Sequence, residues 1–155
     1  VKHAAFLQLV RGRRLRLQRT EPNIGALATA LADLVNPVTA QYHLAFVASD
    51  TFYEHTHRYP GQRHDWQADV DPLLSHAQTY CARIGLDLSD SDRVRLQHAC
   101  YELTRGAHSD TPSTAAYLGG VAAQEVIKIL TVQYIPLDNT CVYDGIVQAV
   151  SSFRL

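Results

Sequence analysis

The segment that decides the fold spans residues 111–132 and reads TPSTAAYLGGVAAQEVIKILTV. It opens with Thr111 before Pro112, a capping residue followed by proline at the first helical position. Apart from a few polar positions, the rest of the segment holds apolar or small residues. A helix that is apolar nearly all round has no face suited to water. We therefore expect a long buried helix that ends near Val132.

The middle of this helix carries two adjacent glycines, Gly119 and Gly120. Together they cost about 2 kcal/mol in helix propensity relative to alanine, so a packing gain must offset them. Ala115, Gly119 and Ala123 recur at four-residue spacing and form a flat strip that a neighbouring backbone can approach closely. The helix is either the centre of the domain's own core or a surface for an element outside this chain, and we favour the latter because the other helices are amphipathic. The candidate partner-packing residues are Ala115, Gly119, Gly120, Ala123, Gln124 and Ile127.

Helical patterns precede this segment and β-like patterns follow it. Apolar spacing and capping signals predict five helices, over about residues 3–19, 23–34, 38–57, 66–84 and 89–106. The fourth of them either kinks at Pro72 or begins there with Asp71 as its cap. Runs rich in Val, Tyr and Phe predict strands over 139–143 and 148–155, joined by a turn at Asp144-Gly145. The chain is thus mostly helical and ends in a helix plus a β-hairpin.

The composition is typical of one globular domain. Of the 155 residues, 46% are hydrophobic and 19% are charged, which supplies a core and argues against disorder. No run of about 18 apolar residues occurs, and the formal net charge of −1 excludes a wholly basic nucleic-acid binder. The three cysteines are odd in number and widely spaced, which favours a reducing compartment, the cytosol or the nucleus. The chain starts at Val1 and contains no methionine, so we expect a fragment of a longer protein.

A family resemblance rests on several stretches of this sequence. The run from Thr111 to Leu155, above all AAYLGGVAAQEVIKI, resembles the C-terminal end of the regulatory subunit of the heterodimeric activating enzyme for the ubiquitin-like modifier NEDD-eight, also called Rub. The opening AAFLQLVRGR, the helix around Tyr42 to Tyr53 and the stretch RYPG at Arg58–Gly61 resemble the same subunit in the same order. Larger ubiquitin-activating enzymes carry a looser version of the final helix and strands.

The resemblance implies a fold and a division of labour. The fold class would be α/β. Residues 1–108 would form a helical insertion, which is the region of the catalytic-cysteine-type half-domain. Residues 109–155 would be the helix and strands that complete a Rossmann-like adenylation-type domain. The subunit would be non-catalytic and would act in a heterodimer, where the catalytic partner holds ATP and magnesium, adenylates the modifier and carries it as a thioester. The fragment itself would hold no catalytic, cofactor or metal residue, would not contact a membrane, and would act in the cytoplasm or the nucleus.

The motifs of the chain fit this non-catalytic interpretation. The sequence contains neither G-x-G-x-x-G nor G-x-x-x-x-G-K-[ST] to cradle phosphates. His98 could activate Cys100, but residues two apart on a helix point to different faces, so we interpret Cys100 as a buried structural cysteine. Cys81 beside Tyr80 receives the same interpretation, and Cys141 has no nearby base in the sequence.

Metal binding is a weaker hypothesis. His55, His57 and His64 lack the paired Cys or His ligands of structural zinc sites, so exposed histidines near a helix C-terminus are the better interpretation. An acidic cluster also lacks the glycine and terminal glutamate of a calcium-binding loop. Its members are Asp87, Asp90 and Asp92.

The strongest rival signal is a run of five arginines, Arg11, Arg13, Arg14, Arg16 and Arg19. Such a run could contact phosphates, but it has no interleaved aromatic residue, and a solvated face or a docking face for an acidic partner fits better. Two alternatives to the regulatory subunit stay open. One is a self-sufficient adenylating enzyme with its ATP loop upstream of Val1, and the other is a helical nucleic-acid-binding module that uses Arg11–Arg19.

Overall fold

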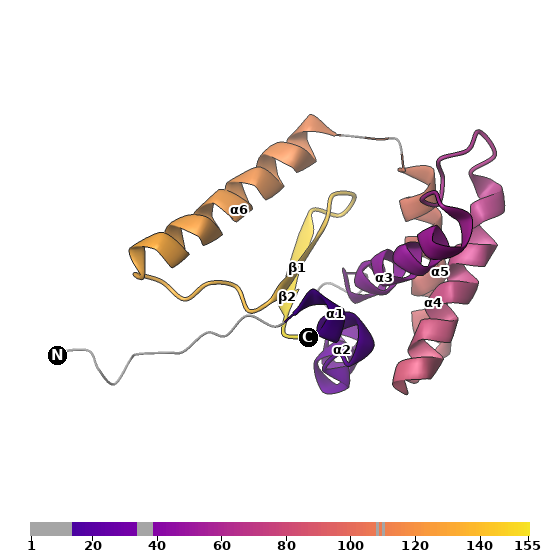
Figure 1. The fold of residues 1–155 in the computed structure, drawn as a ribbon, viewed down its shortest axis with the longest axis horizontal. Coiled ribbons are helices and arrows are strands. Elements are labelled where there is room, and N and C mark those ends of the chain that lie inside the picture. The colour runs from indigo at the N-terminus through magenta and orange to yellow at the C-terminus, as the bar shows by residue number, and fades with distance from the viewer. Residues whose placement is uncertain (1–13, 34–38, 108, 110) are drawn as a thin grey trace.

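The computed structural model describes residues 14–33, 39–107, 109 and 111–155 (Figure 1). Its helices are α1 (Leu15–Thr20), α2 (Ile24–Leu31), α3 (Thr39–Thr56), the 3₁₀ turn η2 (Gln67–Asp69), α4 (Val70–Ile84), α5 (Asp90–Arg105) and α6 (Pro112–Thr131). The strands are β1 (Thr140–Asp144) and β2 (Ala149–Phe153). They pair as an antiparallel hairpin in which Thr140 lies opposite Phe153. The predicted arrangement of helices before a hairpin is confirmed, whereas the Rossmann-like domain and its division at residues 108 and 109 remain predictions.

Helix α3 forms the centre of the helical part and packs against both α4 and α5 (Figure 1). Its inward face carries Leu44, Ala48 and Phe52, all of which are buried. They meet Leu73 of α4 and Leu96 of α5, which are fully buried as well. Each buried leucine or phenylalanine contributes about 1.5–3 kcal/mol to stability, so this interface stabilises the helical part.

The C-terminal hairpin covers another side of α3 and also contacts α2. Val142, Phe153 and Leu155 join the same hydrophobic core as the helices. The side chain of Asn139 closes the base of the hairpin: its Nδ2 donates to the Leu155 carbonyl at 2.8 Å, and the Leu155 N–H donates to its Oδ1 at 3.0 Å. Helices and hairpin therefore share one core although they lie far apart in sequence.

Local capping signals set most helix ends as the sequence predicts. The Asn23 side chain accepts a hydrogen bond from the Ala26 N–H, and Gly85 ends α4 with a left-handed φ of +73°. Ser89 and Asp92 form the predicted capping box of α5. The alternative in which Asp71 caps a helix that starts at Pro72 is wrong, because α4 begins at Val70. Pro72 lies in its first turn, where a missing N–H breaks no helical hydrogen bond.

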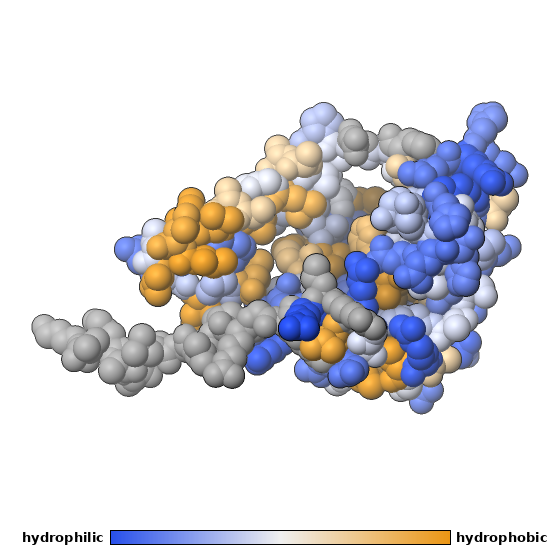
Figure 2. All heavy atoms as spheres, in the orientation of Figure 1, coloured by the Kyte–Doolittle hydropathy of each residue, from blue (hydrophilic) through white to orange (hydrophobic). Residues whose placement is uncertain are grey.

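The final helix is not buried within the described part of the chain, as expected if the element that covers it lies outside this chain, and its burial in a longer protein remains a prediction. No residue of α6 is buried there, and the helix lies across from the hairpin, away from α4 and α5 (Figure 1). Figure 2 shows a hydrophobic surface over α6 at the upper left of the molecule. The sequence pattern measures how apolar the helix is, but burial requires a partner, and none of the described residues covers this face. No helix within the described ranges is long and apolar enough to cross a bilayer.

Candidate functional site

The candidate residues of α6 lie on an open surface. Gly119 and Gly120 would each accept a Cβ without meeting any described atom within 4 Å. Gly120 and Gln124 line an open hollow together with Tyr117. Ala115 and Ala123 are exposed, as are the other candidate residues. The structure thus leaves the predicted strip bare, and its role in packing remains a prediction.

The C-terminal half of α6 exposes large aliphatic side chains. Val126 and Ile127 are half exposed, and Leu130 is 76% exposed. The loop that follows adds Tyr134 at 67% and Ile135 at 56%. Exposed large hydrophobic residues that are contiguous on a soluble protein mark sites of interaction. This half of α6 with its following loop is therefore the strongest candidate interface in the described structure.

A few contacts connect α6 to the hairpin and to the loop between α6 and β1. The rings of Tyr117 and Tyr143 lie 4.5 Å apart. Glu125 accepts hydrogen bonds from Lys128 Nζ at 2.6 Å and from the Leu137 N–H at 2.7 Å. The Lys128 hydrogen bond, followed by that of Leu137, lowers the pKa of the Glu125 carboxyl and keeps it ionised. Glu125 thus holds the loop before β1 against the helix.

The cysteines have no features of nucleophiles. Cys100 is fully buried, and burial raises the pKa of its thiol to about 12. Cys81 is buried likewise, and its pKa rises to about 11 for the same reason. His98 lies on the exposed side of α5, so it does not activate Cys100. The prediction that both cysteines are buried is confirmed, and a neutral, buried thiol is a weak nucleophile. Cys141 is half-buried, and burial raises its pKa as well.

The histidine and aspartate candidates lie at the ends of helices or in the loops beside them. His55 is exposed on the last turn of α3 and stacks on His76 of α4, with ring centroids 5.2 Å apart. His57 ends α3 with a φ of +56°, and His64 is exposed in the following loop. Asp92 caps α5, while Asp87 and Asp90 are exposed. Within the described ranges, no three His, Cys, Asp or Glu side chains gather to hold a metal ion.

The arginine run is described only in part. Arg11 and Arg13 lie outside the described residues, and so does the side chain of Arg16. Arg14 is exposed. Arg19 forms an ion pair with Asp50 of α3 at 2.5 Å and so helps to hold α1 on α3. At Arg19 the run therefore contacts the protein's own acidic residue.

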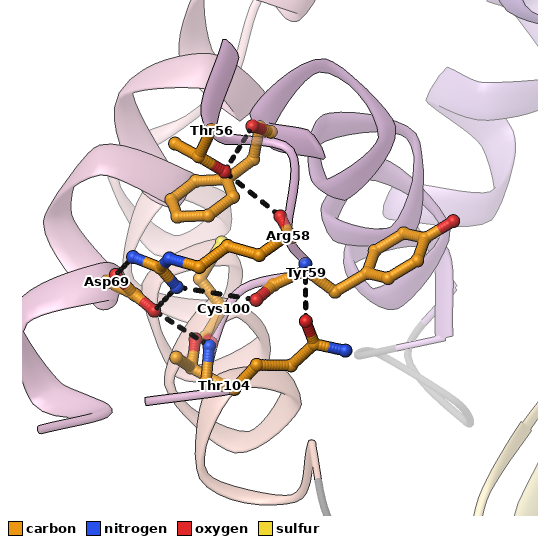
Figure 3. Close-up of polar contacts among 9 residues, drawn as sticks. Thr56, Arg58, Tyr59, Asp69, Cys100 and Thr104 are labelled. Carbon is orange, nitrogen blue, oxygen red and sulfur yellow. Dashed lines mark hydrogen bonds and ion pairs between the residues drawn. The ribbon is translucent and has the colours of Figure 1, made fainter. Parts of the chain in front are cut away.

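An ion-pair network behind the RYPG stretch was not predicted from the sequence (Figure 3). The Arg58 guanidinium donates to both oxygens of the buried Asp69, at 2.5 and 2.6 Å. Asp69 Oδ2 also accepts the Gly61 N–H at 2.9 Å. Arg58 is the main cause that lowers the pKa of Asp69. The sequence Tyr59-Pro60-Gly61 is typical of a turn that stops a helix, but nothing in the spacing identifies Asp69 as its partner.

Comparison with known proteins confirms the resemblance. No protein-family model matches the chain. It is 31% identical over 154 residues to the NEDD8-activating enzyme E1 regulatory subunit of Drosophila melanogaster, and 30% identical over 155 residues to that of Gallus gallus. It is 28% identical over 145 residues to the regulatory subunit AXR1 of Arabidopsis thaliana. The chain is a homologue of NEDD8-activating enzyme regulatory subunits.

The alignments cover nearly all of this chain but only a part of each regulatory subunit. The match to the Drosophila and Gallus regulatory subunits includes 99% of the chain but 28% of each relative. For AXR1 the shares are 94% and 26%. The chain thus spans little more than a quarter of the length of the curated relatives that it matches.

Proposed function

We propose that this chain is the C-terminal portion of a regulatory subunit of a NEDD8-activating enzyme and acts in neddylation by assembly rather than by chemistry. Homology to such subunits over nearly the whole chain supports this proposal. The observation that carries it is the exposed aliphatic surface of α6, because such a surface on a soluble protein is suited to a protein partner.

The finer arrangement follows the division inferred from the sequence. Residues 109–155 complete a Rossmann-like adenylation-type domain, and residues 1–108 belong to a helical insertion in that domain. In this arrangement the rest of the subunit and the catalytic subunit together cover α6. The strip Ala115, Gly119 and Ala123 then admits a neighbouring backbone, which offsets the helix propensity that the two glycines cost.

The chemistry in this proposal belongs to the catalytic partner. That subunit holds ATP and magnesium, adenylates the ubiquitin-like modifier and carries it as a thioester. The buried, neutral thiols of Cys81 and Cys100 support this division, because thioester formation needs an accessible thiolate. The complex acts in the cytoplasm or the nucleus.

The decisive experiment replaces Gly119 by leucine in the full-length regulatory subunit. Four added carbons in a close helix contact cost about 1–3 kcal/mol by overpacking. We expect Gly119→Leu to reduce co-purification with the catalytic subunit and to slow formation of the modifier thioester on that subunit. Pull-down and a thioester gel measure the two effects, and circular dichroism checks the fold.

Two control variants separate interface loss from general damage. Gly119→Ala adds one carbon and recovers about 1 kcal/mol of helix propensity, so it should assemble normally. Gln97→Leu places the same large side chain on the exposed face of α5 and should also assemble normally. Normal assembly and loading by Gly119→Leu would show that the strip is not an interface.

A further inference from the structure

A pocket of about 640 Å³ opens where α3, the loop after it and the start of β1 meet. This volume falls within the range of about 300–1,000 Å³ that is typical of ligand sites. Val47 and Leu103 provide an apolar part of its wall, and Pro60 adds to it. None of the residues that line the pocket belongs to α6, and α3 lies on the other side of the hairpin from α6 (Figure 1).

Exposed aromatic rings border this pocket. Phe46 projects from α3 and is 51% exposed, and Tyr59 of the following loop is 46% exposed. A third ring, that of Tyr53, packs against the Tyr59 ring with centroids 4.8 Å apart and planes tilted by 31°. Aromatic rings bind other aromatic rings through offset or edge-to-face stacking, which adds to the free energy of burying apolar area.

The pocket carries no unpaired formal charge among the described residues that line it. Its two charged side chains, Arg19 and Asp50, pair with each other at 2.5 Å. His43 adds no charge at neutral pH, because burial lowers its pKa to about 4. Because this ion pair already balances the formal charges of the pocket wall, an ionic ligand gains little net electrostatic attraction there, so the pocket favours a neutral one.

The polar groups of the pocket suit a peptide. Gln18 and Gln62 contribute carboxamide side chains, which donate and accept hydrogen bonds as a peptide group does. Gln62 already uses its Oε1 to accept the Tyr59 N–H at 3.1 Å. Its amide nitrogen can still donate to a carbonyl oxygen of a bound segment.

The loop that carries Tyr59 is held in place before any ligand arrives. Asp69 binds Arg58 on one side of Tyr59 and the Gly61 N–H on the other. Figure 3 shows the Tyr59 ring pointing away from this ion pair. A rigid aromatic side chain loses little conformational freedom on binding, which favours recognition.

We propose that this pocket binds a neutral aromatic side chain, a tyrosine or tryptophan presented by a partner polypeptide, stacked between Phe46 and Tyr59. The aromatic border selects a ring over an aliphatic side chain. The internal ion pair selects a neutral group over a phosphate, and the carboxamides accommodate the flanking peptide backbone. The proposal is independent of the interface assigned to α6.

The test is a nuclear magnetic resonance titration of the ¹⁵N-labelled chain with small capped amino acids. N-acetyl-tryptophanamide and N-acetyl-tyrosinamide should shift the amide signals of Val47, Tyr59 and Thr140 in a saturable way. N-acetyl-leucinamide and N-acetyl-phosphotyrosinamide should bind at least about tenfold more weakly. Equal binding of the leucine or phosphotyrosine probe, or the absence of saturable shifts at the pocket, would overturn the proposal.

Variants locate the binding. Phe46→Ala should weaken the tryptophan probe about tenfold, since it removes one stacking surface. Tyr59→Leu should do the same and provides a second measurement if Phe46→Ala does not fold. Tyr134→Ala removes another exposed aromatic ring, in the loop after α6, and should leave binding unchanged. Loss of binding in Tyr134→Ala alone would place the site elsewhere and overturn the proposal.

Discussion

At the scale of single residues, Gly61 shows how closely the loop after α3 approaches α5. Its φ is +82°, and an added Cβ would lie 2.1 Å from the carbonyl oxygen of Thr104. The oxygen belongs to the backbone of α5, so it cannot rotate away as a flexible side chain can. Glycine is therefore required here both by the left-handed conformation and by the close approach.

We predict that Gly61→Ala destabilises the chain by at least about 2 kcal/mol, because it combines a strained φ with a backbone clash. Urea unfolding measures the free energy. The matched control is Gly119→Ala, where the new Cβ meets no described atom within 4 Å and helix propensity improves by up to about 1 kcal/mol. Equal stability of Gly61→Ala and the parent chain would contradict the structure of this loop.

The cysteines give a second prediction at this scale. A thiol reagent such as DTNB should label Cys141 first in the folded chain, because Cys81 and Cys100 are buried and their thiols have strongly raised pKa values. All three should react after unfolding. Cys141→Ser should remove the fast phase of labelling, and rapid reaction of that folded variant would show that a buried thiol is accessible.

At the scale of elements, the helix ends could be predicted from the sequence because capping is local. Ser89 and Asp92 lie three residues apart and exchange hydrogen bonds with each other's backbone. Thr111 was also expected to cap a helix, yet its hydroxyl donates to Thr114 Oγ1 and makes no cap bond to the backbone. A hydroxyl side chain before a helix thus has two roles that only the structure separates.

This difference predicts unequal losses of stability for two similar substitutions. Ser89→Ala should destabilise the chain by about 1 kcal/mol, since it leaves an N–H of the first turn of α5 without its acceptor. Thr111→Ala should change stability by less than about 0.5 kcal/mol, because no backbone cap is lost. Thermal unfolding of both variants checks this, and an equal loss in the two would be inconsistent with the observed caps.

The candidate site could be predicted only in part. The pattern of α6 identified an apolar helix with a bare strip around Gly119, since composition and spacing are visible along the sequence. It could not show that the described chain leaves this helix uncovered, because burial depends on distant partners. The pairing of Arg58 with Asp69 spans eleven residues and a turn, and no periodic pattern encodes such a contact.

At the scale of the whole molecule, the hairpin is docked on the helices through a partly buried histidine. His43 of α3 meets the Phe153 ring edge to face, with centroids 5.8 Å apart. Burial, and to a smaller extent the charge of Arg19, lowers the pKa of His43 from 6.5 to about 4. A proton on this ring would therefore place a charge at the contact between helices and hairpin.

The free energy of unfolding should fall as the pH drops from 6.5 toward 4. In this window the unfolded chain binds a proton at His43 that the folded chain does not, so acid favours unfolding by up to about 3 kcal/mol. Above pH 6.5 the contribution is fully retained. Urea unfolding at several pH values should show a smaller acid effect in His43→Gln, and an identical pH profile would contradict the shift.

The shared core also has a consequence for folding during translation, because its residues are synthesised at different times. Leu27 of α2 and Leu44 of α3 are buried in a cluster that includes Val142, Phe153 and Leu155. A ribosome delivers these last residues about a hundred positions after the first, so the early helices must wait with apolar surface uncovered. Contacts so distant along the chain also slow folding, because loop closure must precede the gain from packing. Until β2 emerges, this uncovered apolar surface favours aggregation.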